Sequence, residues 1–188
     1  MSGSAEIPRE PTRFAYWLRL VLAMVGTALA VGALELTAQL RHQPYGLIPF
    51  VTSIALVMGL PDAPASRPRA LIGGHVISSL VGYGVVLVAG SSPVTAAIGA
   101  GLAVGAMLGT RTMHPPAGID PFLIVHDALG PRFLLETVVP GALLLAVFAW
   151  AWHRIPLVAD SLAAARLRPA PSRSRAERTE DREQEPLP

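Results

Sequence analysis

The stretch His42-Gln-Pro-Tyr-Gly-Leu-Ile-Pro-Phe50 decides the fold of this chain, because it recurs 72 positions later as His114-Pro-Pro-Ala-Gly-Ile-Asp-Pro-Phe122. Both copies fit the pattern HxPxGxxPF, and both stand between hydrophobic segments. Proline lacks the amide donor and glycine loosens the backbone, so neither copy continues an α-helix. Duplicated helix breakers inside hydrophobic segments are the strongest sequence indication of a transport site.

The composition is that of a membrane protein. Of 188 residues, 52% are hydrophobic and only 15% are charged, which is too apolar for an ordinary soluble domain. Four apolar stretches are near or above the roughly 17 to 25 residues that span the hydrocarbon of a bilayer. They cover residues 14–40, 70–89, 93–110 and 133–152, and two shorter stretches cover 48–60 and 121–129. We therefore predict an integral protein of a bacterial inner (plasma) membrane.

Several chemistries find no support in the sequence. The chain has no cysteine, which excludes disulfides, thiolate metal sites and cysteine catalysis. No serine-centred nucleophile elbow, HExxH zinc motif or phosphate-binding loop occurs, and the histidine spacing suggests no metal site. The first apolar stretch is too long for the core of a signal peptide, so we expect a retained helix. We predict no enzyme activity and no cofactor.

The two ends of the chain are polar. We expect residues 1–15 to form a cytoplasmic segment and residues 153–188 a disordered cytoplasmic tail, because Arg, Pro, Ser and Glu dominate from Arg166 onward and cannot build a core. The basic part of the tail, 166–175, suits contact with anionic membrane lipid. No aromatic residues interleave with these arginines, so nucleic acid is not a predicted partner.

The two breakers divide the predicted transmembrane domain, residues 16–152, into two repeats. Each repeat, at about 17–89 and about 93–152, has a full apolar helix, a breaker, a short helix that begins at the second proline (Pro49 or Pro121), a loop and another full helix. The predicted fold is an all-α membrane protein with four full transmembrane helices plus two discontinuous or re-entrant segments.

The number of membrane crossings is open between two arrangements. If each short segment completes a broken crossing, there are six crossings, and the loops with Arg67, Arg69 and Arg111 are cytoplasmic while Arg41 and Arg132 lie outside. If the segments are re-entrant, there are four crossings and all five arginines lie outside. The positive-inside rule favours six. Three crossings per unit would give the units opposite orientations, which is the inverted-repeat architecture.

The amino ends of the short helices are candidate anion sites, because unpaired amides and the helix dipole attract negative charge there. Asp120 is expected to act as the N-cap of the second short helix, whereas Ile48 has no side chain that accepts a hydrogen bond. The first short helix therefore offers the freer site, unless Thr52 or Ser53 satisfies its amides.

Three histidines are candidate site residues, since the reference pKa of histidine near 6.5 suits anion binding or proton relay. His42 and His114 open the breakers, and His75 follows two glycines in a segment that also carries Ser78 and Ser79. The alternatives are a histidine bonded to a carbonyl at a helix end and, for the His75 segment, close helix packing through small residues.

Acidic residues in or beside apolar segments are functional candidates, because charge inside a membrane is costly. They are Glu35, Asp120, Asp127 and Glu136. Glu35 lies near a helix end, from which its side chain can extend to water. Arg111 is expected to neutralise Asp120 or an incoming anion, or else to anchor the chain at the cytoplasmic interface.

Two blocks of sequence resemble the HPP family of integral membrane proteins. One is His114-Pro-Pro-Ala-Gly118; the other runs from Leu60-Pro-Asp-Ala-Pro through Arg67-Pro-Arg to Gly-Gly-His75-Val-Ile-Ser78. The resemblance covers about residues 15–152 and implies a four-helix membrane protein. A plant branch of the family is implicated in moving nitrite across the chloroplast envelope, so nitrite or a similar small anion is the implied substrate. Asp120 departs from relatives, which often have a neutral polar residue such as Asn there.

The leading hypothesis is a channel or transporter for a small monovalent inorganic anion, most simply nitrite, in a homo-oligomer. Alternatives are a scaffold or accessory subunit that transports nothing, and a proton or cation pathway through Asp120 and His114. The predicted pathway residues are His42, Pro44, Gly46, Pro49, Ser53, His75, Ser78, Arg111, His114, Pro116, Gly118 and Asp120.

Overall fold

A computed structural model describes residues 13–42 and 48–166, and all regular elements in these ranges are helical. The α-helices are α1 (Arg13–Leu40), α2 (Val51–Gly59), α3 (Pro68–Ala89), α4 (Pro93–Gly109), α5 (Ile119–His126), α6 (Val139–His153) and α7 (Pro156–Arg166). Short 3-10 turns are η1 (Pro64–Ser66) and η2 (Pro115–Gly118), and the π-helical turn η3 (Leu134–Val138) leads into α6. The prediction of an all-α fold is confirmed for these ranges.

Within residues 13–42 and 48–166, three helices are by length and composition able to cross a membrane: α1, α3 and the helix formed by η3 with α6. Helix α4, the fourth predicted span, has 17 residues. At about 1.5 Å per residue it reaches about 25 Å, less than the roughly 30 Å of a hydrocarbon core. Large apolar side chains point outward over much of the surface, such as Leu87 (87% exposed) and Val88 (86%). A lipid environment suits such a surface.

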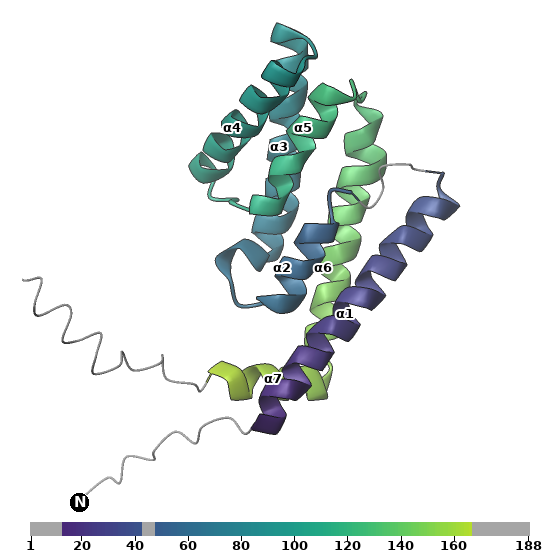
Figure 1. Ribbon diagram of the computed structural model, residues 1–188, viewed down its shortest axis with the longest axis vertical. Coiled ribbons are helices and arrows are strands. Elements are labelled where there is room, and N and C mark those ends of the chain that lie inside the picture. The colour runs from purple at the N-terminus through teal and green to yellow at the C-terminus, as the bar shows by residue number, and fades with distance from the viewer. Residues whose placement is uncertain (1–12, 43–47, 167–188) are drawn as a thin grey trace, which may run out of the picture.

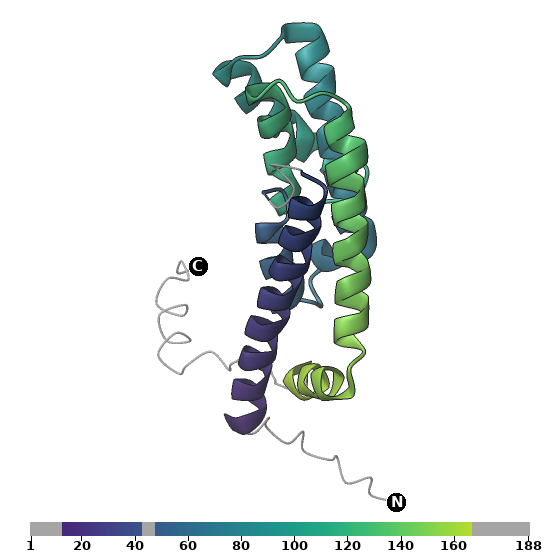
Figure 2. The ribbon, with the colours of Figure 1, turned by 90° about the vertical axis from the view of Figure 1, so that its right-hand side faces the viewer.

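The long helices do not all run in the same direction. In Figures 1 and 2, α1 and α3 run in the same direction and α6 runs in the opposite one. Helix α5 packs against α3 and α4, whereas α2 packs against α1 and α6. Because α1 and α3 are parallel, the chain must return to the starting end of the bundle between them. Helix α2 makes this return, which is the course of a broken crossing.

Three apolar clusters hold the described helices together, and the smallest joins α3, α4 and α5 through Val85, Ala96 and Val125. The largest cluster joins α1, α2, α3 and α6, and its most buried large side chains are Phe50, Ile54, Leu71 and Leu145. The second cluster joins α5 to the start of the last long helix through Leu123, Ile124, Phe133 and Val138. The short helices are thus fixed by packing and not by their own length, since isolated helices of this size are unstable in water.

The predicted start of each short helix is wrong by two residues. Helix α2 begins at Val51, so Pro49 lies in the preceding turn; α5 begins at Ile119, so Pro121 is its third residue. The first four amides of a helix have no intrahelical acceptor. A proline anywhere in that turn therefore loses no intrahelical hydrogen bond. For this reason the position of the proline does not determine at which residue the helix begins.

The prediction of a disordered tail from residue 153 is wrong over α7. This helix packs across the ends of α1 and α6 (Figure 2) and buries Val158 and Ser161. The Arg154 guanidinium lies 4.1 Å from the centre of the Trp150 ring just before α7. The predicted basic tail beyond Arg166 and most of the predicted amino-terminal segment lie outside the described residues.

The parallel course of α1 and α3 predicts on which side of the membrane two exposed positions lie. Single cysteines in an otherwise cysteine-free chain, Asp62→Cys and Ser91→Cys, flank α3. If residue 13 faces the cytoplasm, a membrane-impermeant maleimide should label Asp62→Cys from the cytoplasm and Ser91→Cys from outside. The reverse labelling would replace the six-crossing arrangement by four crossings and two re-entrant loops.

Candidate functional site

A cluster of fully buried polar side chains lies where the short helices meet α3. We call it the polar cluster. It consists of Ser53, His75, Ser78, Ser79, His114 and Asp120, each with 0% exposure. Buried polar groups need hydrogen-bond partners, and the need is greater in an apolar membrane. The bonds among these residues therefore define the geometry of the site.

His75 on α3 joins the two short helices. Its Nε2 lies 3.0 Å from Oγ of Ser53, the third residue of α2. Its Nδ1 lies 2.8 Å from Oδ2 of Asp120, the second residue of α5. The amino ends of α2 and α5 thus meet at one imidazole ring. Each breaker contributes to this point because it lets a new helix begin inside the bundle.

His114 closes the polar cluster from the second breaker. Its Nδ1 donates to the carbonyl of Ala65 over 2.7 Å, and its Nε2 lies 2.9 Å from Oγ of Ser53. The two imidazole rings, of His75 and His114, have centroids 5.2 Å apart. Gly74 allows α3 to lie this close to His114, since a Cβ atom at Gly74 would lie 2.6 Å from Cβ of His114.

The two serines of α3 tie the second breaker to this helix. The hydroxyl of Ser78 donates to the carbonyl of Ala117, and Oγ of Ser79 lies 3.4 Å from Oδ2 of Asp120. Among the described residues, the other carboxyl oxygen, Oδ1 of Asp120, has no hydrogen-bond partner. An unsatisfied buried acceptor is costly. A proton on Oδ1 or a donor from a bound ligand would satisfy it.

The hydrogen bonds set the smallest number of protons that the polar cluster can hold. The Ala65 carbonyl only accepts, so Nδ1 of His114 carries a hydrogen. The single hydroxyl hydrogen of Ser53 is donated to one histidine or to the Pro49 carbonyl, so at least one histidine must donate from its own Nε2. With the bond to Asp120, this pattern needs at least one proton beyond two neutral imidazoles and an ionised carboxylate. With one such proton the cluster has no net charge, which suits an apolar environment.

The predicted pathway residues divide into four groups, of which His42 and Arg111 form the last. Ser53, His75, Ser78, His114 and Asp120 come together in the polar cluster. Three others lie beside it: Pro49, whose carbonyl is 3.4 Å from Oγ of Ser53, and Pro116 and Gly118 in η2. Pro44 and Gly46 lie outside the described residues.

His42 and Arg111 do not join the polar cluster. Both are exposed, and both have positive φ angles, 53° and 57°, just after the ends of α1 and α4. This left-handed conformation ends helices. The prediction that Arg111 neutralises Asp120 is wrong, because His75 bonds to that carboxyl group. Asp120 is also not an N-cap: Gly118 takes that position in α5, and the Asp120 side chain points to α3 instead.

Sequence reasoning missed three contributors to the site. Ser79 is absent from the predicted pathway residues, yet it bonds to the carboxyl group of Asp120. Phe50 packs on the His75 ring with centroids 4.8 Å apart. The Ala65 carbonyl orients His114. The repeated phenylalanine of HxPxGxxPF was a usable signal for Phe50, but a backbone carbonyl leaves no signal in a sequence.

The fold and the site define a class of protein: a helical integral membrane protein with a polar centre inside an apolar bundle. The chain belongs to the HPP family, because the family model described as "HPP, transmembrane region" matches residues 12–160. Among the described residues, no group of three or more His, Cys, Asp or Glu side chains is arranged to hold a metal ion.

Two curated relatives, both from Dictyostelium discoideum, are named only as transmembrane proteins. One is 30% identical over 108 residues, covering 53% of this chain and 35% of the relative. The other is 29% identical over 108 residues, covering 53% of this chain and 38% of the relative. The match thus spans little more than a third of the length of either relative. No solved structure matches the chain.

The contact at Gly74 predicts a position where the smallest side-chain addition destabilises the fold. Gly74→Ala should lower the free energy of unfolding by about 1 to 3 kcal/mol, because overpacking displaces neighbouring atoms; here these include the Thr112 carbonyl oxygen, 3.0 Å from the added atom. Gly101→Ala on α4 is the matched control, since nothing lies within 4 Å of its Cβ position. Thermal unfolding in detergent measures both. Equal midpoints for the two variants would contradict the packing assigned to Gly74.

Proposed function

We propose that this protein is a channel or transporter for a small monovalent anion, with nitrite as the leading candidate, and that the polar cluster lies on its pathway. The observation that carries the proposal is the meeting of both short-helix amino ends at His75, inside an apolar bundle. Ionisable groups buried within a membrane are costly and usually functional. Nitrite is preferred because the chain belongs to the HPP family. A plant branch of that family is implicated in moving nitrite.

The first short helix supports an anion as the substrate. The N-cap of α2, Phe50, makes no side-chain hydrogen bond to the first turn. The amides of that turn and the helix dipole favour negative charge. A second proton on the cluster, shared by His75 and His114, would make it cationic and would attract an anion further.

The carboxyl group of Asp120 would oppose an anion if it were isolated and ionised. In the structure it is 2.8 Å from Nδ1 of His75, so the pair carries no net charge when it shares one proton. The acidic residue at this position is therefore compatible with anion passage. The unsatisfied Oδ1 also offers an acceptor for a protonated ligand.

We propose that the protein is not an enzyme, although Ser53, His75 and Asp120 have the bonding order of a serine hydrolase triad. In a hydrolase the serine hydroxyl must reach the acyl carbon of a substrate. Ser53 is fully buried, and its hydroxyl also contacts Nε2 of His114. The triad-like arrangement therefore supports proton transfer better than nucleophilic attack.

The hydrogen-bonded chain favours a second candidate function, proton movement alone or coupled to the anion. The additional proton can reside on Asp120, His75 or His114. Transfer from His75 to the Ser53 hydroxyl, with release of the serine hydrogen to His114, moves positive charge between the rings without breaking the chain. These contacts of 2.9 and 3.0 Å are within hydrogen-bond distance.

We further propose that the two breakers belong to inverted repeats that complete six crossings. The parallel α1 and α3 support this arrangement, and so does the meeting of α2 and α5 by their amino ends. In inverted-repeat transporters, discontinuous helices meet near the middle of the membrane at the substrate site. The polar cluster would then be the place where the two repeats contact each other.

Flux through liposomes tests the function and one residue of the cluster. Purified protein should pass nitrite above the leak of empty vesicles, and His114→Ala should reduce the flux by about tenfold or more, since it leaves buried partners unsatisfied. His126→Ala is the control, because His126 is 52% exposed and pairs with Asp127 outside the cluster. Wild-type vesicles that pass no nitrite, nitrate, formate or chloride would refute the function; full flux through His114→Ala would refute the residue assignment.

A pH-sensitive dye inside the vesicles separates the two candidate functions. If protons accompany the anion, nitrite should acidify the lumen, and Asp120→Asn should reduce this acidification more than it reduces nitrite uptake, because the amide cannot release the shared proton. Reversal potentials in a nitrite gradient provide the second measurement. Proton flux in the absence of any permeant anion would favour the proton pathway instead.

A further inference from the structure

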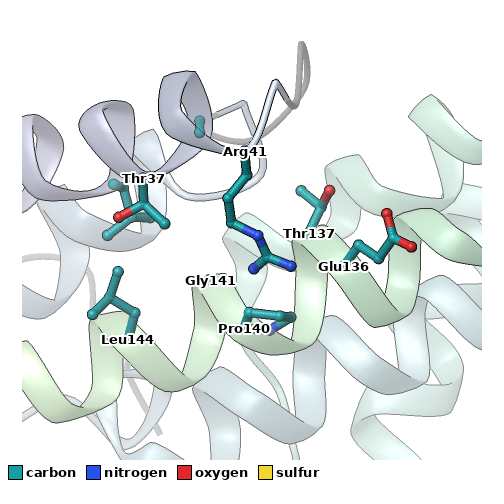
Figure 3. Close-up of a pocket in the computed structure, with 9 residues that line it drawn as sticks. Thr37, Arg41, Glu136, Thr137, Pro140, Gly141 and Leu144 are labelled. Atoms are coloured by element: carbon teal, nitrogen blue, oxygen red, sulfur yellow. The ribbon is translucent and has the colours of Figure 1, made fainter.

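A crevice opens between the end of α1 and the start of the last long helix (Figure 3). Its cavity volume is about 180 Å³, below the roughly 300 to 1,000 Å³ of sites for drug-sized ligands. Its polar lining residues are Thr37, Arg41, Glu136 and Thr137. The size and the polar lining fit a small ion better than an organic molecule.

Arg41 supplies the positive charge of this crevice. Figure 3 shows its guanidinium group directed from the end of α1 toward the Thr137 and Pro140 segment, while the carboxylate of Glu136 points away from it. Arginine stays charged at every physiological pH, and its planar fork binds two oxygens of one anion at the same time. A small planar oxyanion is therefore the ligand class that the crevice fits beside Arg41.

The backbone of the last long helix is irregular at the crevice. Residues 134–138 form a π-helical turn, which ends just before Pro140. Such single turns are rare and frequently occur at functional sites. One turn further along the wall, Gly141 leaves room for the ring of Phe50, because a Cβ atom at Gly141 would overlap that ring.

Phe50 separates the crevice from the polar cluster. One part of its ring packs on Gly141, which lines the crevice. Its centroid is also 4.8 Å from that of the His75 ring, and the side chain is 0% exposed. The order in space is therefore crevice, Phe50 ring, His75.

The equivalent phenylalanine of the second breaker has no such place. Phe122 is 39% exposed and stacks on His126, with centroids 5.3 Å apart. The repeated sequence thus does not by itself put a phenylalanine between a crevice and the polar cluster. The position of Phe50 is a property of the first breaker alone.

We propose that the Arg41 crevice is the outer binding site for the transported anion and that Phe50 is the barrier between this site and the polar cluster. This inference rests on the proposed anion transport. An oxyanion held by Arg41 reaches His75 when the Phe50 ring moves away from Gly141. The charge of Arg41 concentrates anions at the outer side of the barrier.

The Arg41 side chain is tested by nitrite uptake into proteoliposomes as a function of nitrite concentration. Arg41→Gln should raise the KM for nitrite by about three- to tenfold with little change in maximal rate, because a partly exposed charge-assisted contact is lost. Arg132→Gln removes an exposed charge that does not line the crevice. Equal KM values for Arg41→Gln, Arg132→Gln and the wild type would overturn the outer site.

The barrier is tested by shortening the two equivalent phenylalanines. Phe50→Leu should increase nitrite flux several-fold and weaken discrimination between nitrite and chloride, whereas Phe122→Leu should change neither. Leucine is apolar like phenylalanine and close to it in volume. Size-exclusion chromatography checks that the Phe50→Leu variant is folded. Folded Phe50→Leu with wild-type flux and selectivity would overturn the barrier. Wild-type vesicles without anion flux would instead overturn the proposed function, so the two failures are distinguishable.

Discussion

The hydrogen bonds of one imidazole ring hold the centre of this protein together. His75 binds Ser53 on α2 through Nε2 and Asp120 on α5 through Nδ1. Neither short helix has the length to be stable alone, and both depend on this ring and on the apolar clusters beside it. Since no water competes inside an apolar bundle, each of these polar groups must find its partner within the protein.

The same constraint connects structure with proposed function. The bonds among His75, Ser53, His114 and Asp120 are all satisfied only when the cluster holds at least one additional proton, and one such proton also cancels the charge of the carboxylate. Any shift of α2 relative to α5 changes these bonds and therefore the number of protons or ions that the cluster favours. A site built on two helix ends is sensitive to the movements that a transporter needs.

The duplicated breakers are alike in sequence and unlike in structure. His114 is fully buried in the polar cluster while His42 is exposed, and Phe50 is buried at the cluster while Phe122 is partly exposed. Each copy therefore supplies a different part: the first an aromatic ring and the serine of α2, the second a histidine and an aspartate. The two copies differ because they contact different neighbouring helices. The repeated motif does not contain those helices.

The sequence by itself determined the helical class, the positions of the long apolar segments and the interruption of two of them, because hydrophobic length and the chemistry of proline and glycine act locally. It also indicated His75, His114 and Asp120 as candidates. Only the tertiary structure decided that Asp120 bonds to His75 instead of Arg111, and that Phe50 lies between the ring of His75 and Gly141. Such pairings join residues 25 or more positions apart. Their geometry depends on how whole helices pack, which no local pattern specifies.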